Sequence, residues 1–215
     1  MATHTVVIGC GDTARATALT RAVTARGVED VADLWPLDRA ITAGRSLDTS
    51  LIVLDGYPPA DMLRAIADLT DTRPELGVLI VGPLDPNVDV MVALASGAFG
   101  YLPTSSSPAA IGDAVTAMLA GEAVLPHAVS SPLVQHLRSG GRGILVRRFN
   151  GHEVALTNRE WEVLVLLRQA RSTAEIARHL VVSPGTVRTH VSALVHKFGV
   201  RDRDGLAQPS GSTVG

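Results

Sequence analysis

The chain has 215 residues, a formal net charge of −2 and 46% hydrophobic residues, of which few are aromatic. This length allows one large domain or two small ones, with cores built from Ala, Val, Leu and Ile. A single cysteine, Cys10, excludes an internal disulfide and is typical of a reducing compartment. Neither a signal peptide nor a run long enough to span a bilayer is present in the sequence, so we expect a soluble, cytoplasmic protein with no membrane partner.

The charge is divided unevenly along the chain. Residues 1–140 carry 8 Lys and Arg against 15 Asp and Glu, a balance of −7. Residues 141–215 carry 11 against 6, a balance of +5, and the two balances sum to −2. We therefore expect only the C-terminal part to bind a polyanion.

Residues 1–124 alternate short apolar runs with segments of helical pattern. The runs are Thr5–Ile8, Val28–Leu34, Leu51–Leu54, Val78–Val81 and Phe99–Leu102, and the helices are expected at Thr13–Arg26, Pro36–Gly44, Pro59–Leu69, Asn87–Ser96 and Pro108–Ala120. Continuous apolar runs indicate strands buried on both faces of a parallel sheet. This pattern predicts a doubly wound α/β domain with five strands. Its sites should lie at the carboxyl ends of the strands, at Gly9–Asp12, Asp55–Tyr57, Gly82–Asp85 and Pro103–Ser105.

Gly9–Ala14 matches the dinucleotide fingerprint G-x-G-x-x-A after a strand and before a helix. The acidic partner expected about 20 residues later would be Asp30 or Asp33. A regulator that senses a nucleotide or another small molecule at this rim is therefore one alternative.

The order of elements and Asp55 at the end of the third strand favour another interpretation. Leu51–Asp55, Ser96–Leu102 and Ala120–Leu125 resemble segments of the receiver domains of bacterial response regulators. The resemblance covers the whole N-terminal part. It implies a flavodoxin-like strand order and makes Asp55 the counterpart of the phosphoacceptor.

Four of the five groups that a receiver uses for phosphorylation are replaced. Cys10 and Gly11 stand where the resemblance implies an acidic pair, with Asp12 the nearest acid, while Gly82 replaces a hydroxyl residue and Thr104 a lysine. Receivers need oxygen ligands to hold Mg²⁺. We therefore expect an atypical receiver in which Asp55 lacks metal ligands and a cationic neighbour, has a structural role and is not switched by conventional phosphorylation. The alternative is a working phosphoacceptor that uses Asp12 as a metal ligand.

Residues 125–152 have the composition of a linker. Within Ile144–Leu156, two short strands are expected around the Asn150–Gly151 turn. Residues 153–208 follow as a helical domain in which Thr157 with Glu160, and Ser172 with Glu175, form capping boxes. The spacing predicts a helix-turn-helix, and the polar residues 209–215 are expected to be a disordered tail.

The helix expected over Ser183–Phe198 starts with Ser-Pro and ends before Gly199. It has a narrow apolar stripe and an outer face of small and hydrogen-bonding residues, which suits a DNA major groove.

From Leu156 to Arg203 the sequence resembles the LuxR/FixJ-type (NarL-like) DNA-binding domain. The resemblance implies that Arg188, Thr189 and Ser192 face bases. It also implies that Thr186, His190, Lys197, Arg201 and Arg203 contact phosphates.

The sequence thus predicts a regulator of transcription that binds double-stranded DNA, with no catalytic site, metal or cofactor. The family's fourth helix would be short here, at Asp204–Gln208. A homodimer is therefore expected to form through the receiver-like domain, for example through Pro108–Ala120.

Overall fold

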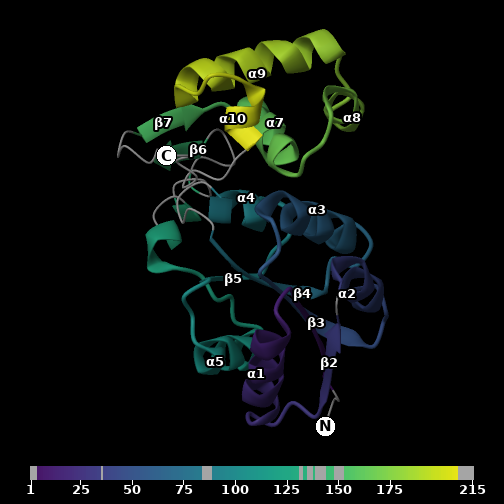
Figure 1. Ribbon diagram of the computed structural model, residues 1–215. Coiled ribbons are helices and arrows are strands. Elements are labelled where there is room, and N and C mark those ends of the chain that lie inside the picture. The colour runs from purple at the N-terminus through teal and green to yellow at the C-terminus, as the bar shows by residue number, and fades with distance from the viewer. Residues whose placement is uncertain are drawn as a thin grey trace. The chain divides into compact units, whose positions relative to one another are not determined.

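A computed structural model describes residues 4–34, 36–83, 89–130, 133, 134, 138, 144–147 and 153–207 (Figure 1). The chain forms two compact units. The first comprises Met1–Pro83 with Ser96–Pro126, and the second comprises Leu84–Ala95 with His127–Gly215. The Asn150–Gly151 turn and the tail at 209–215 lie outside the described residues.

The first unit contains a five-stranded parallel sheet. Its strands are β1 (Thr5–Cys10), β2 (Asp30–Leu34), β3 (Thr49–Asp55), β4 (Gly77–Gly82) and β5 (Gly100–Pro103), in the order β2-β1-β3-β4-β5. This flavodoxin-like order confirms the predicted sheet. β3 and β4 are almost completely buried, as their uninterrupted apolar runs predict.

Helices cover both faces of this sheet (Figure 1). α1 (Thr13–Thr24) and α5 (Pro108–Leu119) pack together on one face, where a buried core joins them to β1, β3 and β4. α2 (Leu37–Gly44) and α3 (Pro59–Thr70) cover the other face. The parallel register brings the ends of β1 and β3 together, because Cys10 pairs with Asp55.

The second unit is mainly helical. It contains α4 (Asp89–Ala95), the 3₁₀ turn η1 (His127–Val129), α7 (Asn158–Arg168), α8 (Thr173–His179), α9 (Pro184–Phe198) and α10 (Arg203–Ala207). The antiparallel strands β6 (Ile144–Arg147) and β7 (Glu153–Leu156) confirm the predicted strand pair. α7 packs against α4, α8, α9, α10 and β7, and the buried Arg168 pairs with the buried Asp89 at 2.5 Å.

Among the described residues, no helix combines the length and apolar character needed to cross a membrane.

Candidate functional site

The ends of α9 are fixed by local sequence. Ser183 is the N-cap, and its Oγ accepts a hydrogen bond from the Thr186 amide at 3.1 Å. Pro184 occupies the first turn, where no amide hydrogen is needed. Gly199 ends the helix in the left-handed conformation at φ +66°. These features confirm the predicted helix.

The inner side of α9 packs into the second unit. Val187 and Leu194 are fully buried, seven residues apart, and the helix contacts α7, α8 and α10. Both preceding helices start with complete capping boxes, formed by Thr157 with Glu160 and by Ser172 with Glu175. α9 is therefore held by two helices whose start points are themselves fixed.

The outer side of α9 carries the side chains expected to read bases. Arg188, Thr189 and Ser192 are exposed, and so is Thr186 near the N-terminus. The Arg188 side chain has no hydrogen bond or ion pair within the described part of the chain, so its donors are available to a ligand. The Thr189 hydroxyl donates to the Gly185 carbonyl at 3.2 Å, which leaves its methyl group and lone pairs for an outside partner.

The residues expected to contact phosphates differ in their surroundings. Arg201 is exposed and His190 is half-buried. The Lys197 ammonium instead donates to Glu160 Oε2 at 2.6 Å and to the Ala155 carbonyl at 3.0 Å. The Arg203 guanidinium donates to the Arg171 carbonyl at 2.6 Å and to Thr173 Oγ1 at 3.1 Å. Lys197 and Arg203 thus join elements of the second unit, in addition to any contact with DNA.

Glu160 lies at the centre of the Lys197 contacts. Its Oε2 also accepts hydrogen bonds from the Thr157 amide at 2.8 Å and the Thr157 hydroxyl at 3.1 Å. Burial by itself would raise the pKa of Glu160, but the hydrogen bonds from Lys197 and Thr157 outweigh it and lower that pKa. One ionised carboxylate therefore links the start of α7 to the last turn of α9.

The sequence interpretation missed Arg178 as a candidate contact. Arg178 is exposed in the last turn of α8, directly before the turn that leads to α9. Its side chain has no partner among the described residues. In helix-turn-helix proteins, a cation on the helix before the one that enters the groove is suited to a phosphate contact. In the sequence, Arg178 lies directly before the turn Leu180–Ser183 of the predicted helix-turn-helix, and this position could have identified it as a candidate phosphate contact.

At the receiver rim, the structure corrects one expectation. Asp55 is buried at the end of β3, and it has a cationic neighbour. Arg15 Nε of α1 donates to Asp55 Oδ2 at 2.5 Å. Burial raises the pKa of Asp55, and the hydrogen bond and charge of Arg15 offset only part of this effect. The predicted structural role stays a prediction, but the absence of a cationic neighbour was wrong, because the carboxylate is paired with an arginine.

The rim residues do not fit the Mg²⁺ ion that the receiver fold implies. Cys10 is buried and Gly11 has no side chain, so this position supplies no carboxylate. The Asp12 carboxylate caps α1 by accepting from the Arg15 amide at 2.7 Å. A hard cation needs several oxygen ligands, whereas Asp55 is already paired with a guanidinium.

The other two replaced positions are Gly82 and Thr104. A Cβ atom at Gly82 would lie 3.0 Å from Cε of Met62, so a hydroxyl residue here would require the end of the Met62 side chain to shift. Thr104 is exposed, and its carbonyl accepts from Arg15 Nη2 at 3.3 Å. Gly82 has no side chain, and Thr104 offers only a neutral hydroxyl in place of the cationic lysine that the resemblance implies.

The glycines of the Gly9–Ala14 motif have a packing role. A Cβ atom at Gly9 would lie 2.8 Å from the Cβ of Ala40, so glycine allows α2 to approach β1 closely. The Gly11 amide donates to the Asp55 carbonyl at 3.2 Å and is not free for a phosphate. The acidic N-cap Asp12 would also repel an anion at the start of α1. These contacts argue against a dinucleotide at this rim.

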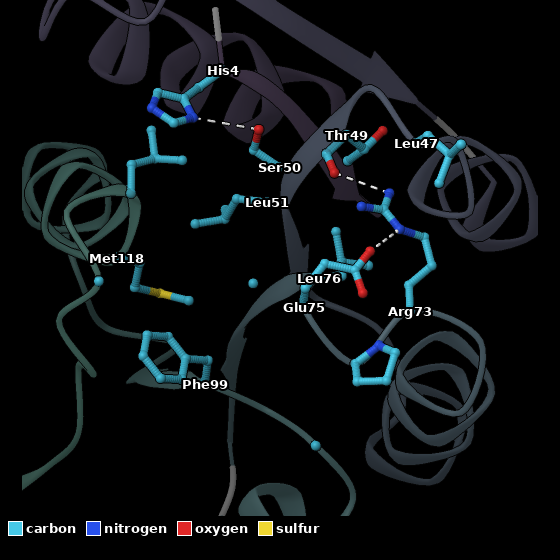
Figure 2. A pocket seen from close by; sticks show the side chains of 15 residues that line it. His4, Leu47, Thr49, Ser50, Leu51, Arg73, Glu75, Leu76, Phe99 and Met118 are labelled. Carbon is cyan, nitrogen blue, oxygen red and sulfur yellow. Dashed lines mark hydrogen bonds and ion pairs between the residues drawn. The ribbon is translucent and has the colours of Figure 1, made fainter. Parts of the chain in front are cut away.

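A hollow of about 510 Å³ lies at the opposite end of the strands (Figure 2). Leu51, Leu76, Phe99 and Met118 line it, and Arg73 points along one side (Figure 2). The Arg73 guanidinium is bonded to Glu75 Oε1 at 2.8 Å and to backbone carbonyls, among them that of Thr49 at 3.0 Å. The Arg73 guanidinium is therefore engaged in bonds within the fold. Ligands of doubly wound domains bind at the carboxyl ends of the strands, whereas this hollow lies at the other end, so it is a weaker candidate site.

Comparisons with known proteins agree with both units. The family model for bacterial regulatory proteins of the luxR family matches residues 154–209. The nitrate/nitrite response regulator protein NarL of Escherichia coli K12 is 30% identical over 167 residues, which cover 77% of this chain and 75% of NarL. The transcriptional regulatory protein LiaR of Bacillus subtilis is 29% identical over 71% of this chain and 68% of LiaR.

Solved structures show the same fold. RcsB from Salmonella enterica serovar Typhimurium, bound to the rprA promoter in the presence of the phosphomimetic BeF3⁻, has a TM-score of 0.59 at 19% identity and covers 98% of this chain and 99% of RcsB. An RcsB–DNA complex has a TM-score of 0.56 at 18% identity, with 97% and 99% covered. The chain therefore belongs to the NarL-like response regulators, whose helix-turn-helix unit is of the luxR family.

Proposed function

We propose that this response regulator binds double-stranded DNA sequence-specifically through α9 and regulates transcription without conventional phosphorylation of Asp55. The main support for DNA binding is the exposed outer face of α9. Arg188, Thr189 and Ser192 are exposed on a helix that is capped at both ends and packed on its inner side. Arginine reads guanine through a bidentate pair of hydrogen bonds, and a threonine methyl group can contact the thymine methyl.

Phosphate contacts are assigned to the cations and polar groups around this face. Thr186, His190 and Arg201 belong to this set, together with Arg178 of α8. Lys197 and Arg203 are secondary members of this set, because their side chains already donate hydrogen bonds within the second unit. Because few cations without an internal partner surround this face among the described residues, one unit should bind weakly, and a homodimer on paired half-sites would supply the missing affinity. We place the dimer contact on the first unit, at α5.

A mobility-shift experiment at several salt concentrations, on genomic fragments selected by the protein, tests the DNA-binding proposal. Arg188→Ala should relax the sequence preference, with a loss of about 1–3 kcal/mol at one base position. Arg201→Ala is the matched control and should weaken binding to all sequences alike. Equal effects of both variants on all sequences would contradict the assigned roles.

The absence of phosphoryl control rests on Asp55. Its carboxylate is buried and paired with Arg15, and the rim residues that the structure describes supply no set of oxygen ligands for Mg²⁺. Treatment with acetyl phosphate and Mg²⁺, followed by intact-mass measurement, should give no phosphoryl adduct. An adduct that maps to Asp55 would contradict this part of the proposal and support control by phosphorylation.

A further inference from the structure

One guanidinium group connects three segments of the first unit. Arg15 Nε donates to Asp55 Oδ2 at 2.5 Å, at the end of β3. Its Nη2 lies 3.3 Å from the Thr104 carbonyl and 3.4 Å from the Ser106 carbonyl, in the loop between β5 and α5. The side chain starts from the first turn of α1. The rim of the sheet and the loop that leads into α5 are therefore bonded to the same cation.

The position of Arg15 is itself fixed. Asp12 caps α1 and accepts a hydrogen bond from the Arg15 amide at 2.7 Å. Arg26 lies two residues beyond the end of α1, in the turn that follows the helix. Arg26 Nε donates to Asp113 Oδ1 of α5 at 2.6 Å. A Cβ atom at Gly112 would lie 2.9 Å from the Ala22 carbonyl, which shows how closely the two helices approach. The two arginines thus bind the α5 side at both ends of α1.

The pairing also has a cost that a purely stabilising contact would avoid. Asp55 Oδ1 is buried without a hydrogen-bond partner among the described residues. A hydrophobic residue at position 55 would remove this cost, since burying an unsatisfied polar atom is unfavourable. An aspartate here is more easily explained if its charge is needed to hold the guanidinium.

We propose that Arg15 is a built-in counter-ion that takes the place of the divalent cation at this rim. It binds the carboxylate of Asp55 and holds the loop 103–107, and with it the start of α5, in one position. Because guanidinium is always charged and is covalently part of the chain, this lock needs no metal, phosphoryl donor or signal concentration. The proposal rests on the proposed absence of phosphoryl control and supplies its mechanism.

Hydrogen–deuterium exchange on the full chain tests the lock. The Ser106 amide donates to the Pro103 carbonyl and the Ala110 amide to Ser107 Oγ, so both amides report on this loop. Arg15→Met keeps the aliphatic stem and removes the charge, and it should raise exchange at these amides by about tenfold or more. Arg21→Met, on an exposed arginine of the same helix without a side-chain partner among the described residues, is the matched control and should change nothing.

Equal exchange in Arg15→Met and Arg21→Met would overturn the proposal. If Arg15→Met does not fold, Asp55→Asn decides, because it keeps the shape of the side chain but removes its charge. Faster exchange of the 103–110 segment in Asp55→Asn supports the lock, and unchanged exchange overturns it. A phosphoryl adduct on the wild-type protein would contradict the proposed function separately, since the exchange experiment contains no phosphoryl donor.

Discussion

Lys197→Met separates two roles for the last turn of α9. The wild-type ammonium makes hydrogen bonds to Glu160 Oε2 at 2.6 Å and to the Ala155 carbonyl at 3.0 Å, and its side chain is 33% exposed. A hydrogen bond to a charged group contributes about 1.5–3 kcal/mol, and solvent screening puts this contact near the lower end. Glu160 keeps its bonds to Thr157 in the variant. We therefore expect a loss of about 2 kcal/mol in the unfolding free energy.

The assay combines urea unfolding with DNA binding at several salt concentrations. A loss of about 2 kcal/mol corresponds to a fall in Tm on the order of 10 °C for a small unit. If Lys197 acts within the fold, the dependence of log Kd on log salt should keep its slope. If Lys197 contacts a phosphate, the slope should fall by about 1. Arg201→Met is the control and should lower the slope without changing stability. Unchanged stability together with a reduced slope in Lys197→Met would refute the internal role.

Three further predictions concern strained backbone and buried charge. Val181 is a β-branched residue at φ +54° and is 89% exposed, so Val181→Asn should raise the unfolding free energy by about 1 kcal/mol, and Val181→Ala should raise it by less. A Val181→Asn variant that is no more stable in urea than the wild type would contradict this prediction. Gly97→Ala should cost about 3 kcal/mol, because φ is +107° and the new Cβ would lie 2.4 Å from Thr70 Oγ1. Gly121→Ala, at φ +88° with open space around it, should cost only about 1 kcal/mol, and similar losses for both would exclude the packing argument. The pKa of Asp55 is raised in the folded protein, so the stability that Asp55 contributes is present below the ordinary pKa near 4 and is lost as the pH rises through the raised pKa. Urea unfolding of the wild type from pH 4 to 7 should show this loss of unfolding free energy. If the same loss persists in Asp55→Asn, it belongs to another group.

Local signals predicted most of the fold. The apolar runs located all five strands of the sheet, and the pairs Thr157 with Glu160 and Ser172 with Glu175 located the starts of α7 and α8. Ser183, Pro184 and Gly199 did the same for both ends of α9. These signals act over three or four residues and can be read without tertiary structure.

Contacts between distant residues could not be predicted in this way. Arg15 and Asp55 are 40 residues apart, and Lys197 and Glu160 are 37 apart. An arginine in the first turn of a helix and a lysine in the last turn of another are usually solvated, so the sequence offers no reason to expect internal partners for either. The family resemblance therefore assigned Lys197 to DNA, and Arg15 was left without a role. The packing of Met62 over Gly82 depends likewise on how α3 lies on the sheet.

Affinity for a selected genomic fragment, measured before and after treatment with acetyl phosphate and Mg²⁺, tests the central claim most directly. The account predicts the same Kd within about twofold in both states, because the charge at Asp55 is already bound by Arg15. It also predicts that Arg188→Ala loses the preference for the selected fragment over other DNA in both states. Sequence-specific binding that appears only after treatment, together with an adduct on Asp55, would contradict the account.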